Sequence, residues 1–234
     1  MAPIAQEEPG APGPPARHAA AARRRAQTKG AAAPGGARVS GQSAKAARTK
    51  PRLAVLRDQA LLLLGFAGGF RRSELVALDI EDLSFTDEGL RVLIRWSKTD
   101  QEGEGRTVGI PPGGHGQTCP VRAVRAYLEA LEQLRVVSGA LFRPLTHTGK
   151  LRRTRLTPQS VALVVKQAAL QAGANPKDYA SHSLRAGLVT AAARAGKSIP
   201  AIMRQTGHRS VATVTKYVRE VELFAENAAE GVGL

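Results

Sequence analysis

Cysteine is nearly absent from this chain of 234 residues, in which Cys119 is the only one. A disulfide within the chain is therefore excluded, and the composition fits a reducing compartment, so we expect a cytoplasmic protein. Long apolar stretches are also missing. The longest uncharged apolar run near the front, Ala60 to Phe70, is shorter than the roughly 20 residues that span a bilayer, and it predicts a buried helix. The N-terminus lacks the basic and then apolar pattern of a signal peptide.

Acidic residues are scarce relative to basic ones. The chain has 19 Asp and Glu against 34 Lys and Arg, a net charge of +15 and a pI of about 11.0. Residues 1–52 contain ten basic and two acidic residues, so the rest of the chain, with 24 and 17, is basic in its own right. Such a protein is expected to bind an anionic partner, either nucleic acid or a membrane surface. The predicted helices show no broad apolar face opposite a Lys/Arg face, which disfavours the membrane.

Clusters of metal ligands are missing as well. The sequence has no acidic cluster that would hold Mg²⁺. It also lacks the Cys/His array of a zinc site. We therefore predict no metal site.

Residues 1–50 differ in composition from the rest of the chain. They consist mainly of Ala, Pro, Gly and Arg, with almost no large apolar side chains. Such a segment cannot bury enough surface to offset the entropy that is lost on ordering. We therefore predict a disordered basic tail over residues 1–50 and a folded domain over residues 51–234.

The folded part begins with helical patterns and then changes to a strand pattern. LAVLRDQALLLLGFAGGF predicts a helix that stops at its Gly-Gly pair, and RRSELVAL predicts a second, short helix. Over residues 90–97, Val92, Ile94 and Trp96 alternate with polar residues, which is the period of a strand; a Gly-rich turn and the returning strand RTVGIP follow. Further helices are predicted at 120–135, 157–172, 181–195, 198–206 and 211–224. This order predicts an α+β fold that is mostly α-helical, with a small antiparallel β-sheet near residues 83–110.

Two short motifs pair an arginine with a polar residue three positions away. In GGFRRSELVAL, Arg71 precedes Glu74 by three residues. This spacing is typical of a surface ion pair, but it also fits an arginine that binds an anion and is held in place by the carboxylate. In HSLRAG, His182 and Arg185 are neighbours on a helical face that is free to line a site, and such a pair suits a phosphate. Taken alone, each motif is more simply an ordinary surface feature. The apolar stripe of the second helix is formed by Leu184, Leu188, Ala191 and Ala192.

Three further residues could complete a phosphate site. Lys98 lies where the predicted strand meets the turn, where a lysine is usually only solvated but can also protonate a leaving group. His208 follows Gly207 just before a predicted helix, and Tyr217 lies late in that helix. A phenol with a pKa near 10 is a weak nucleophile at neutral pH unless cations stabilise the phenolate. Tyr217 could equally be an amphipathic residue at the edge of the core.

Together these residues resemble the catalytic domain of the tyrosine recombinase, or phage integrase, family. The family has an Arg in a G-x-R-x-x-E-L box, a hairpin Lys, an H-x-x-R box, a His or Trp after Gly, and a later Tyr. The corresponding segments here are GGFRRSELVAL, SKTDQEGEGR, HSLRAG, TGHRS and TKYV. All six catalytic positions match in type, order and spacing, and the resemblance covers about residues 52–234.

The resemblance implies that Tyr217 is the nucleophile. It would attack a DNA phosphate and form a 3′-phosphotyrosyl link, while Arg71 and Arg185 stabilise the charge on the pentacoordinate phosphorus. Glu74 would support Arg71. The implied activity is site-specific recombination or DNA integration.

The remaining positions would handle protons and orient the phosphate. By resemblance, Lys98 protonates the departing 5′-oxygen, His182 assists proton transfer or orients the phosphate, and His208 hydrogen-bonds a non-bridging oxygen. The phosphodiester is exchanged for a phosphotyrosine of similar energy, so no ATP and no other cofactor is implied.

The resemblance also implies double-stranded DNA as the partner and a homo-oligomer on it, a tetramer in the family. The family usually has a helical core-binding (SAM-like) domain before the catalytic domain. A low-complexity tail stands in its place here, so we expect that domain to be absent. The long loop 143–156 is basic and is a candidate for DNA contact. The residues predicted to contact DNA are Arg72, Arg152, Arg153, Arg155, Arg209 and Lys216.

Two alternatives share part of this pattern. A type IB topoisomerase-like enzyme would nick and close DNA with the same residues but would not exchange strands. A decayed integrase would occupy DNA only as a binding module. The sequence identifies neither the target site nor the direction of the reaction.

Overall fold

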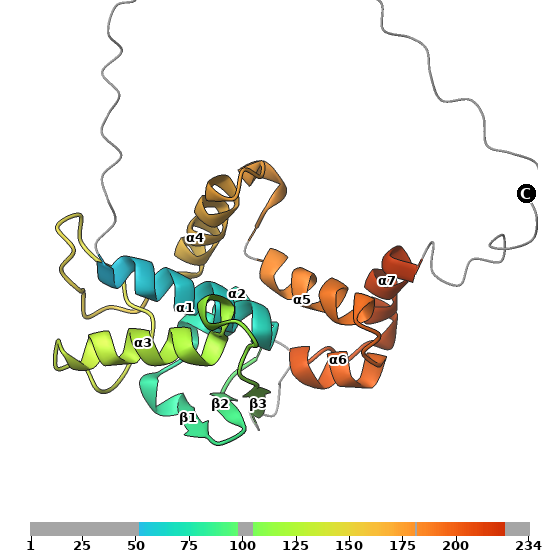
Figure 1. The fold of residues 1–234 in the computed structure, drawn as a ribbon, viewed down its shortest axis with the longest axis horizontal. Helices are drawn as coiled ribbons and strands as arrows, with labels where there is room; N and C mark the ends of the chain where they lie inside the picture. The colour runs from blue at the N-terminus through green and yellow to red at the C-terminus, as the bar shows by residue number, and fades with distance from the viewer. Residues whose placement is uncertain (1–51, 98–104, 181, 223–234) are drawn as a thin grey trace, which may run out of the picture. The chain divides into compact units, whose positions relative to one another are not determined.

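The computed structural model describes residues 52–97, 105–180 and 182–222 (Figure 1). The predicted basic tail lies outside these residues. The elements in chain order are α1 (Arg52–Gly68), α2 (Arg72–Ala77), η1 (Ile80–Asp82), β1 (Leu83–Thr86), β2 (Gly89–Ile94), β3 (Arg106–Ile110), η2 (Gly116–Thr118), α3 (Pro120–Glu132), α4 (Pro158–Gln171), η3 (Pro176–Asp178), α5 (Ser183–Arg194), α6 (Ile199–Thr206) and α7 (Val211–Glu222).

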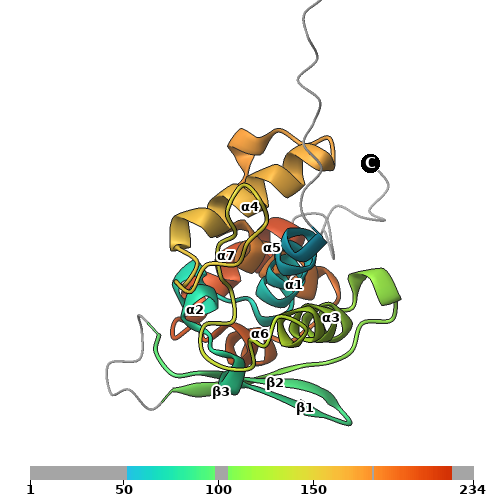
Figure 2. The same cartoon turned by 90° about the vertical axis from the view of Figure 1, so that its left-hand side faces the viewer.

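The three strands form one antiparallel sheet in the order β1-β2-β3. Val92 of β2 pairs with Leu83 of β1 and Val108 of β3, which fixes the register. Leu90, Val92 and Ile94 are buried, whereas the residues between them are exposed. A strand that alternates in this way has one face on the core and one toward solvent. Figure 2 agrees, because it shows the helices on one side of the sheet.

The predicted strand at 90–97 is longer than the observed one. β2 ends at Ile94, whose partner Arg106 is the last of the ladder. Trp96, which we placed on one face of the strand with Val92 and Ile94, is 71% exposed, whereas those two residues are buried. Beyond the last ladder pair, the pleat no longer directs alternate side chains to opposite faces. The prediction for Trp96 is therefore wrong, although the strand itself was identified. The first strand, β1, was not assigned residue by residue from the sequence.

Two helix ends follow from local chemistry. α1 ends because Gly69 adopts a left-handed φ of 57°, where a Cβ would lie 2.7 Å from Cγ2 of Thr206. α3 was predicted to reach residue 135 but ends at Glu132, and Arg135 has a φ of 59°. At the other end, α4 and α6 begin with a side chain cap, Thr157 and Ser198 respectively, followed by a proline in the first turn.

The apolar core has a large part and a small part. The large cluster joins α1, α2, the sheet and α3, and its biggest members are Phe70, Tyr127 and Phe142, all fully buried. The small cluster joins α5, α6 and α7 through Val189, Ile202 and Val214. α1 packs against α5, so the two clusters lie on either side of this helix contact. None of the described helices is long and apolar enough to cross a membrane.

We predict that Tyr127→Phe lowers the free energy of unfolding by about 1 kcal/mol. The hydroxyl of Tyr127 donates a 3.1 Å hydrogen bond to the carbonyl of Leu141, and burial raises its pKa to about 12. Removing the hydroxyl leaves the buried carbonyl without that donor and keeps the ring stacked on Phe142. Urea denaturation of the wild type, Tyr127→Phe and the exposed-site control Tyr179→Phe measures the difference. An equal loss of unfolding free energy in Tyr127→Phe and in the exposed control Tyr179→Phe would contradict a stabilising hydrogen bond from Tyr127 to Leu141.

Candidate active site

The site is built around the buried carboxylate of Glu74, which is 1% exposed. Arg71 immediately precedes α2, and its backbone N–H donates to Glu74 Oε2 at 2.9 Å. Its Nη1 donates to Glu74 Oε1 at 2.6 Å and to Ser97 Oγ at 2.9 Å. The hydroxyl of Ser97 in turn donates to the same Oε1 at 2.9 Å. The guanidinium of Arg71 is therefore held from two sides.

Arg106 on β3 is the second arginine on this carboxylate, and sequence reasoning missed it. Its Nη2 lies 3.5 Å from Glu74 Oε2. Its Nη1 and Nη2 also donate to the carbonyls of Gln205 and Thr206, at the end of α6, at 3.1 and 3.3 Å. Burial, then the charge of Arg71, lowers its pKa, while Glu74 opposes that shift. The only sequence signal was a basic residue at the start of a strand, which is too common to single it out.

Arg185 on α5 is 1% exposed. Its Nη1 donates to the carbonyls of Gly69 and Thr206. Its Nη2 is buried and has no hydrogen-bond partner among the described residues. Burial, followed by the charges of Arg71 and Arg106, lowers its pKa to about 10, so the guanidinium is still charged at neutral pH. A buried charged donor without a partner is costly, and an anion that reached it would relieve that cost.

The arrangement of α5 corrects part of our expectation for this helix. α5 begins at Ser183, and His182 is its N-cap with helical φ and ψ, so His182 stays beside Arg185 at the start of the helix. The buried residues of α5 are Arg185 and Val189, whereas Ala191, assigned to the apolar stripe, is exposed. An arginine can occupy the buried side because carbonyl groups accept its hydrogen bonds.

Two histidines lie beside these arginines. Burial, then Arg185 and Arg71, lowers the pKa of His182. Burial and the neighbouring charges lower the pKa of His208 to about 4, with Arg185 the largest electrostatic cause, followed by Arg71, His182 and Arg106. Nδ1 of His208 lies 2.7 Å from Oγ1 of Thr206. Both imidazoles are therefore neutral at pH 7 in the free protein.

Tyr217 lies on α7, half-buried against the small cluster of Val189, Ile202 and Val214. It is near enough to Arg185 to influence that arginine's pKa. The structure thus places Tyr217 with five other predicted site residues, namely Arg71, Glu74, His182, Arg185 and His208. Lys98 lies outside the described residues.

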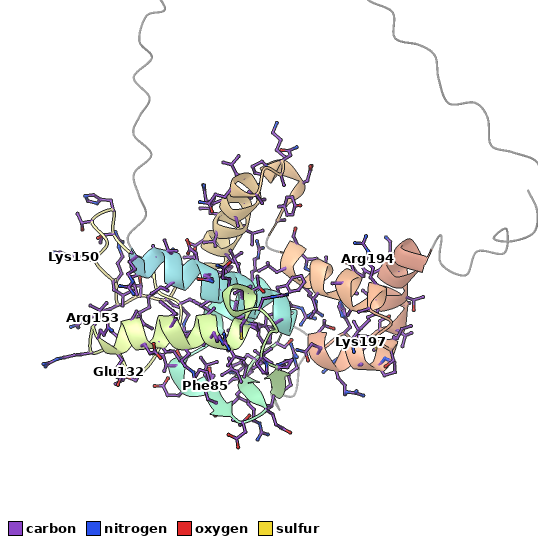
Figure 3. The ribbon with its side chains drawn as sticks, in the orientation of Figure 1. Phe85, Glu132, Lys150, Arg153, Arg194 and Lys197 are labelled. Atoms are coloured by element: carbon purple, nitrogen blue, oxygen red, sulfur yellow. The ribbon has the colours of Figure 1, made fainter. Side chains whose placement is uncertain are left out.

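The predicted DNA contacts differ in how they are held. Arg72, Arg152, Arg153, Arg209 and Lys216 are exposed. Arg155 is exposed too, but its Nη1 lies within 3.1 Å of the carbonyls of Val76, Ala77 and Leu78, and its Nη2 donates to Asp79 at 2.8 Å. It serves the C-terminal end of α2, where backbone carbonyls lack helical partners. In Figure 3, Lys150 and Arg153 mark its loop, on the opposite side of the view from Arg194 and Lys197 at the end of α5.

Comparison with known proteins identifies the family. The sequence matches the model of the phage integrase family over residues 43–222. The chain belongs to this family. It is 43% identical over 177 residues to an integrase/recombinase xerD homolog of Selenomonas ruminantium, with 76% of this chain and 51% of that protein covered. It is 31% identical over 161 residues to the tyrosine recombinase XerC of Azotobacter vinelandii, with 69% and 47% covered. This integrase-family chain spans about half the length of the curated relatives it matches.

Solved structures of recombinases share the fold. The XerH site-specific recombinase, bound to palindromic difH substrate in a post-cleavage complex, superposes with a TM-score of 0.59 at 18% identity, covering 77% of this chain and 47% of that one. The XerA recombinase gives 0.53 at 20% identity, covering 81% and 66%. The expected fold, mostly helical with a small antiparallel sheet, is thereby confirmed. Within the described part of the chain, no group of three or more His, Cys, Asp and Glu residues is placed to hold a metal ion.

We predict that His208 in the free protein titrates with a pKa of about 4, against an ordinary 6.5. Because the pKa is lower in the folded state, the unfolded chain binds more protons between these two values. The contribution of His208 to the free energy of unfolding is therefore fully present above pH 6.5 and is lost as the pH falls from 6.5 to about 4. An NMR titration of the ring resonances, assigned with His208→Gln, measures the pKa. A midpoint near 6.5 would show that neither burial nor the neighbouring cations act on the pKa of His208.

Proposed function

We propose that this chain cleaves and rejoins double-stranded DNA through a covalent phosphotyrosyl intermediate, as one subunit of a site-specific recombinase. The observation that carries the proposal is the convergence of Arg71, Arg185, His208 and Tyr217 from four separate segments into one electrostatically coupled group. A cluster of cations and neutral imidazoles around a phenol suits attack on a phosphate.

The first step exchanges one ester for another. The phenolic oxygen of Tyr217 attacks the scissile phosphorus and loses its proton, and the bond from phosphorus to the 5′-oxygen breaks. The products are a 3′-phosphotyrosyl link and a 5′-hydroxyl, which takes up a proton; Lys98 is proposed as the donor. Rejoining is the reverse reaction with a 5′-hydroxyl as nucleophile. Since the number of phosphoester bonds is unchanged, no ATP is needed.

The arginines stabilise the transition state. Phosphoryl transfer depends mainly on positioning and on neutralising charge on the equatorial oxygens. Arg71 is oriented by Glu74 and Ser97, and Arg185 carries a buried Nη2 that has no partner among the described residues. Both are fixed before the substrate arrives, so little reorganisation is needed at the moment of reaction.

The histidines deal with protons and oxygens. His182 is exposed, and its lowered pKa keeps its imidazole neutral, so it can accept the proton that the phenol loses. His208 is proposed to bind a non-bridging oxygen. Bound phosphate would raise the pKa of His208, because an adjacent anion favours the charged form.

The partner and the assembly follow the family. XerH is described as bound to its difH substrate, and we propose duplex DNA for this chain as well. We also propose a homotetramer on DNA and a cytoplasmic location. The exposed basic residues proposed for DNA contact are Arg72, Arg152, Arg153, Arg209 and Lys216; Arg155 is exposed as well, but its guanidinium is engaged at the end of α2.

We predict that the wild type, but not Tyr217→Phe, becomes covalently attached to DNA. The phenylalanine variant keeps the packing against the small cluster and lacks only the nucleophilic oxygen. Cells that express each form are lysed in SDS, the protein is recovered, and the attached DNA is sequenced. Attachment of the wild type at one recurring sequence supports the recombinase.

The other outcomes separate the alternatives. Attachment scattered over the genome favours the topoisomerase-like enzyme, which relaxation of a supercoiled plasmid without recombination would support further. Equal recovery of DNA with the wild type and Tyr217→Phe would refute the nucleophile. No attachment by either form, with DNA binding retained, would favour the binding module.

We predict that Arg71→Ala lowers the cleavage rate by about 10²–10³-fold while DNA binding largely persists. Arg71 acts at one phosphate, whereas the remaining basic surface supplies most of the non-specific affinity. The matched control is Arg91→Ala, an exposed arginine on β2. Cleavage of a suicide substrate and filter binding over a range of salt concentrations are measured for both. Loss of binding in step with cleavage would contradict the role of Arg71, and a flat salt response would contradict a phosphate-dominated interface.

A further inference from the structure

The side chain of Thr206 lies between two groups that both present an atom able to accept a hydrogen bond. Thr206 is the last residue of α6 and is fully buried. Its Oγ1 is 2.7 Å from the carbonyl oxygen of Ile202 and 2.7 Å from Nδ1 of His208. The question is which group donates the hydrogen in each of these two contacts.

The hydroxyl has a single proton to place. A carbonyl oxygen has no proton of its own, so the short contact with Ile202 is a hydrogen bond only if Thr206 donates to it, as helical threonines commonly do to the carbonyl four residues earlier. The contact with His208 must then take its proton from the ring. Nδ1 of His208 therefore carries the hydrogen and donates to Oγ1, and in the neutral ring Nε2 has a free lone pair.

The position of Thr206 is itself fixed from the other side. Its carbonyl oxygen accepts hydrogen bonds from Arg185 Nη1 and from Arg106 Nη2. Its methyl group faces Gly69, where even an added Cβ would come within 2.7 Å. The backbone of Thr206 is thus held by the same arginines that surround the site, and a shift of His208 relative to them would break its bond to the Thr206 hydroxyl.

We propose that Thr206 is a positioning residue that locks His208 in the Nδ1–H tautomer and leaves Nε2 as the atom that meets the substrate. This rests on the proposed function, because it assigns Nε2 of His208 to the phosphate. A neutral ring in this tautomer cannot donate from Nε2. His208 therefore binds a phosphate oxygen only after taking up a proton, and formation of the complex takes up one proton at His208.

Burial and the charged groups around His208 set the cost of that proton. Burial, then Arg185 on α5, Arg71 before α2 and Arg106 on β3, disfavours a positive ring in the free protein, and a protonated His182 at the start of α5 would do the same. A dianionic transition state reverses the balance. The proton should consequently arrive with the phosphate and leave with it.

The tautomer is measured directly in the full-length free protein by long-range ¹H–¹⁵N NMR of the imidazole rings, with His208→Gln for assignment. We expect a protonated Nδ1 and an unprotonated Nε2 for His208 at pH 7. Thr206→Val, which keeps the shape and removes the hydroxyl, should shift the ring toward Nε2–H, and Thr206→Ser should restore the wild-type tautomer. Thr215→Val is the matched control, because the hydroxyl of Thr215 also donates to the carbonyl four residues earlier but, among the described residues, has no hydrogen bond to a histidine.

A wild-type spectrum with Nε2 protonated and Nδ1 unprotonated would overturn the proposal without any variant. The proposal can therefore be tested even if Thr206→Val fails to fold. An unchanged tautomer in folded Thr206→Val would overturn it as well. Thermal unfolding of each variant shows which of them are folded.

A second readout concerns the reaction. Cleavage by the wild type should fall as the pH rises, because proton uptake at His208 becomes harder. Thr206→Val should flatten this profile, because its Nε2–H tautomer can donate without taking up a proton, and Thr206→Ser should keep it. If no cleavage is detected in any form, the proposed function fails while the NMR result still decides the tautomer. A profile that Thr206→Val leaves unchanged would argue that Thr206 is only structural.

Discussion

The guanidinium of Arg185 connects the two parts of the molecule from which the site is assembled. Its hydrogen bonds reach Gly69, at the end of α1 in the large cluster, and Thr206, at the end of α6 in the small one. Gly69 can offer its carbonyl there because its left-handed backbone turns the chain immediately after the helix. Losing this side chain would leave the carbonyl of Gly69 without its charged donor and the carbonyl of Thr206 with Arg106 alone. The positions of His208 and Thr206 depend on that contact.

The site holds more positive charge than it neutralises. Arg71 and Arg106 contact Glu74 directly, and Arg185 is influenced by the same carboxylate, so three guanidinium groups share one buried acid. Burial, and after it this excess of charge, lowers the pKa of both histidines and of Arg185 and Arg106. Repulsion of this kind is unfavourable in the free protein, and under the proposed function a bound phosphate would offset it. The repulsion among these cations and their attraction for an anion have the same origin, the excess of positive charge.

Much of the fold was accessible from the sequence, and the reasons are local. The helices ended close to their predicted limits because caps, prolines and glycines mark them, as Thr157, Ser198 and Gly207 do. The strand at 90–94 was visible in its alternation. The errors occurred where a local sequence pattern continued beyond the end of the element. The strand pattern runs on to Trp96, past the last ladder pair. The helical pattern runs on to residue 135, although α3 ends at Glu132 and Arg135 has a left-handed backbone.

The sequence by itself determined which reactive residue types are present and in what order, because spacing within motifs such as GGFRRSELVAL and HSLRAG is a local property. Only the tertiary structure decided that Arg106 joins Glu74, that Arg185 is buried, and that Arg155 serves the end of α2. Arg106 meets its α6 carbonyls across 99 and 100 residues, Arg185 meets Gly69 across 116, and Arg155 meets α2 across 77 to 79. An arginine that will bind a distant carbonyl looks the same in a sequence as one that will remain in solvent. The difference arises only when folding brings the acceptor to it.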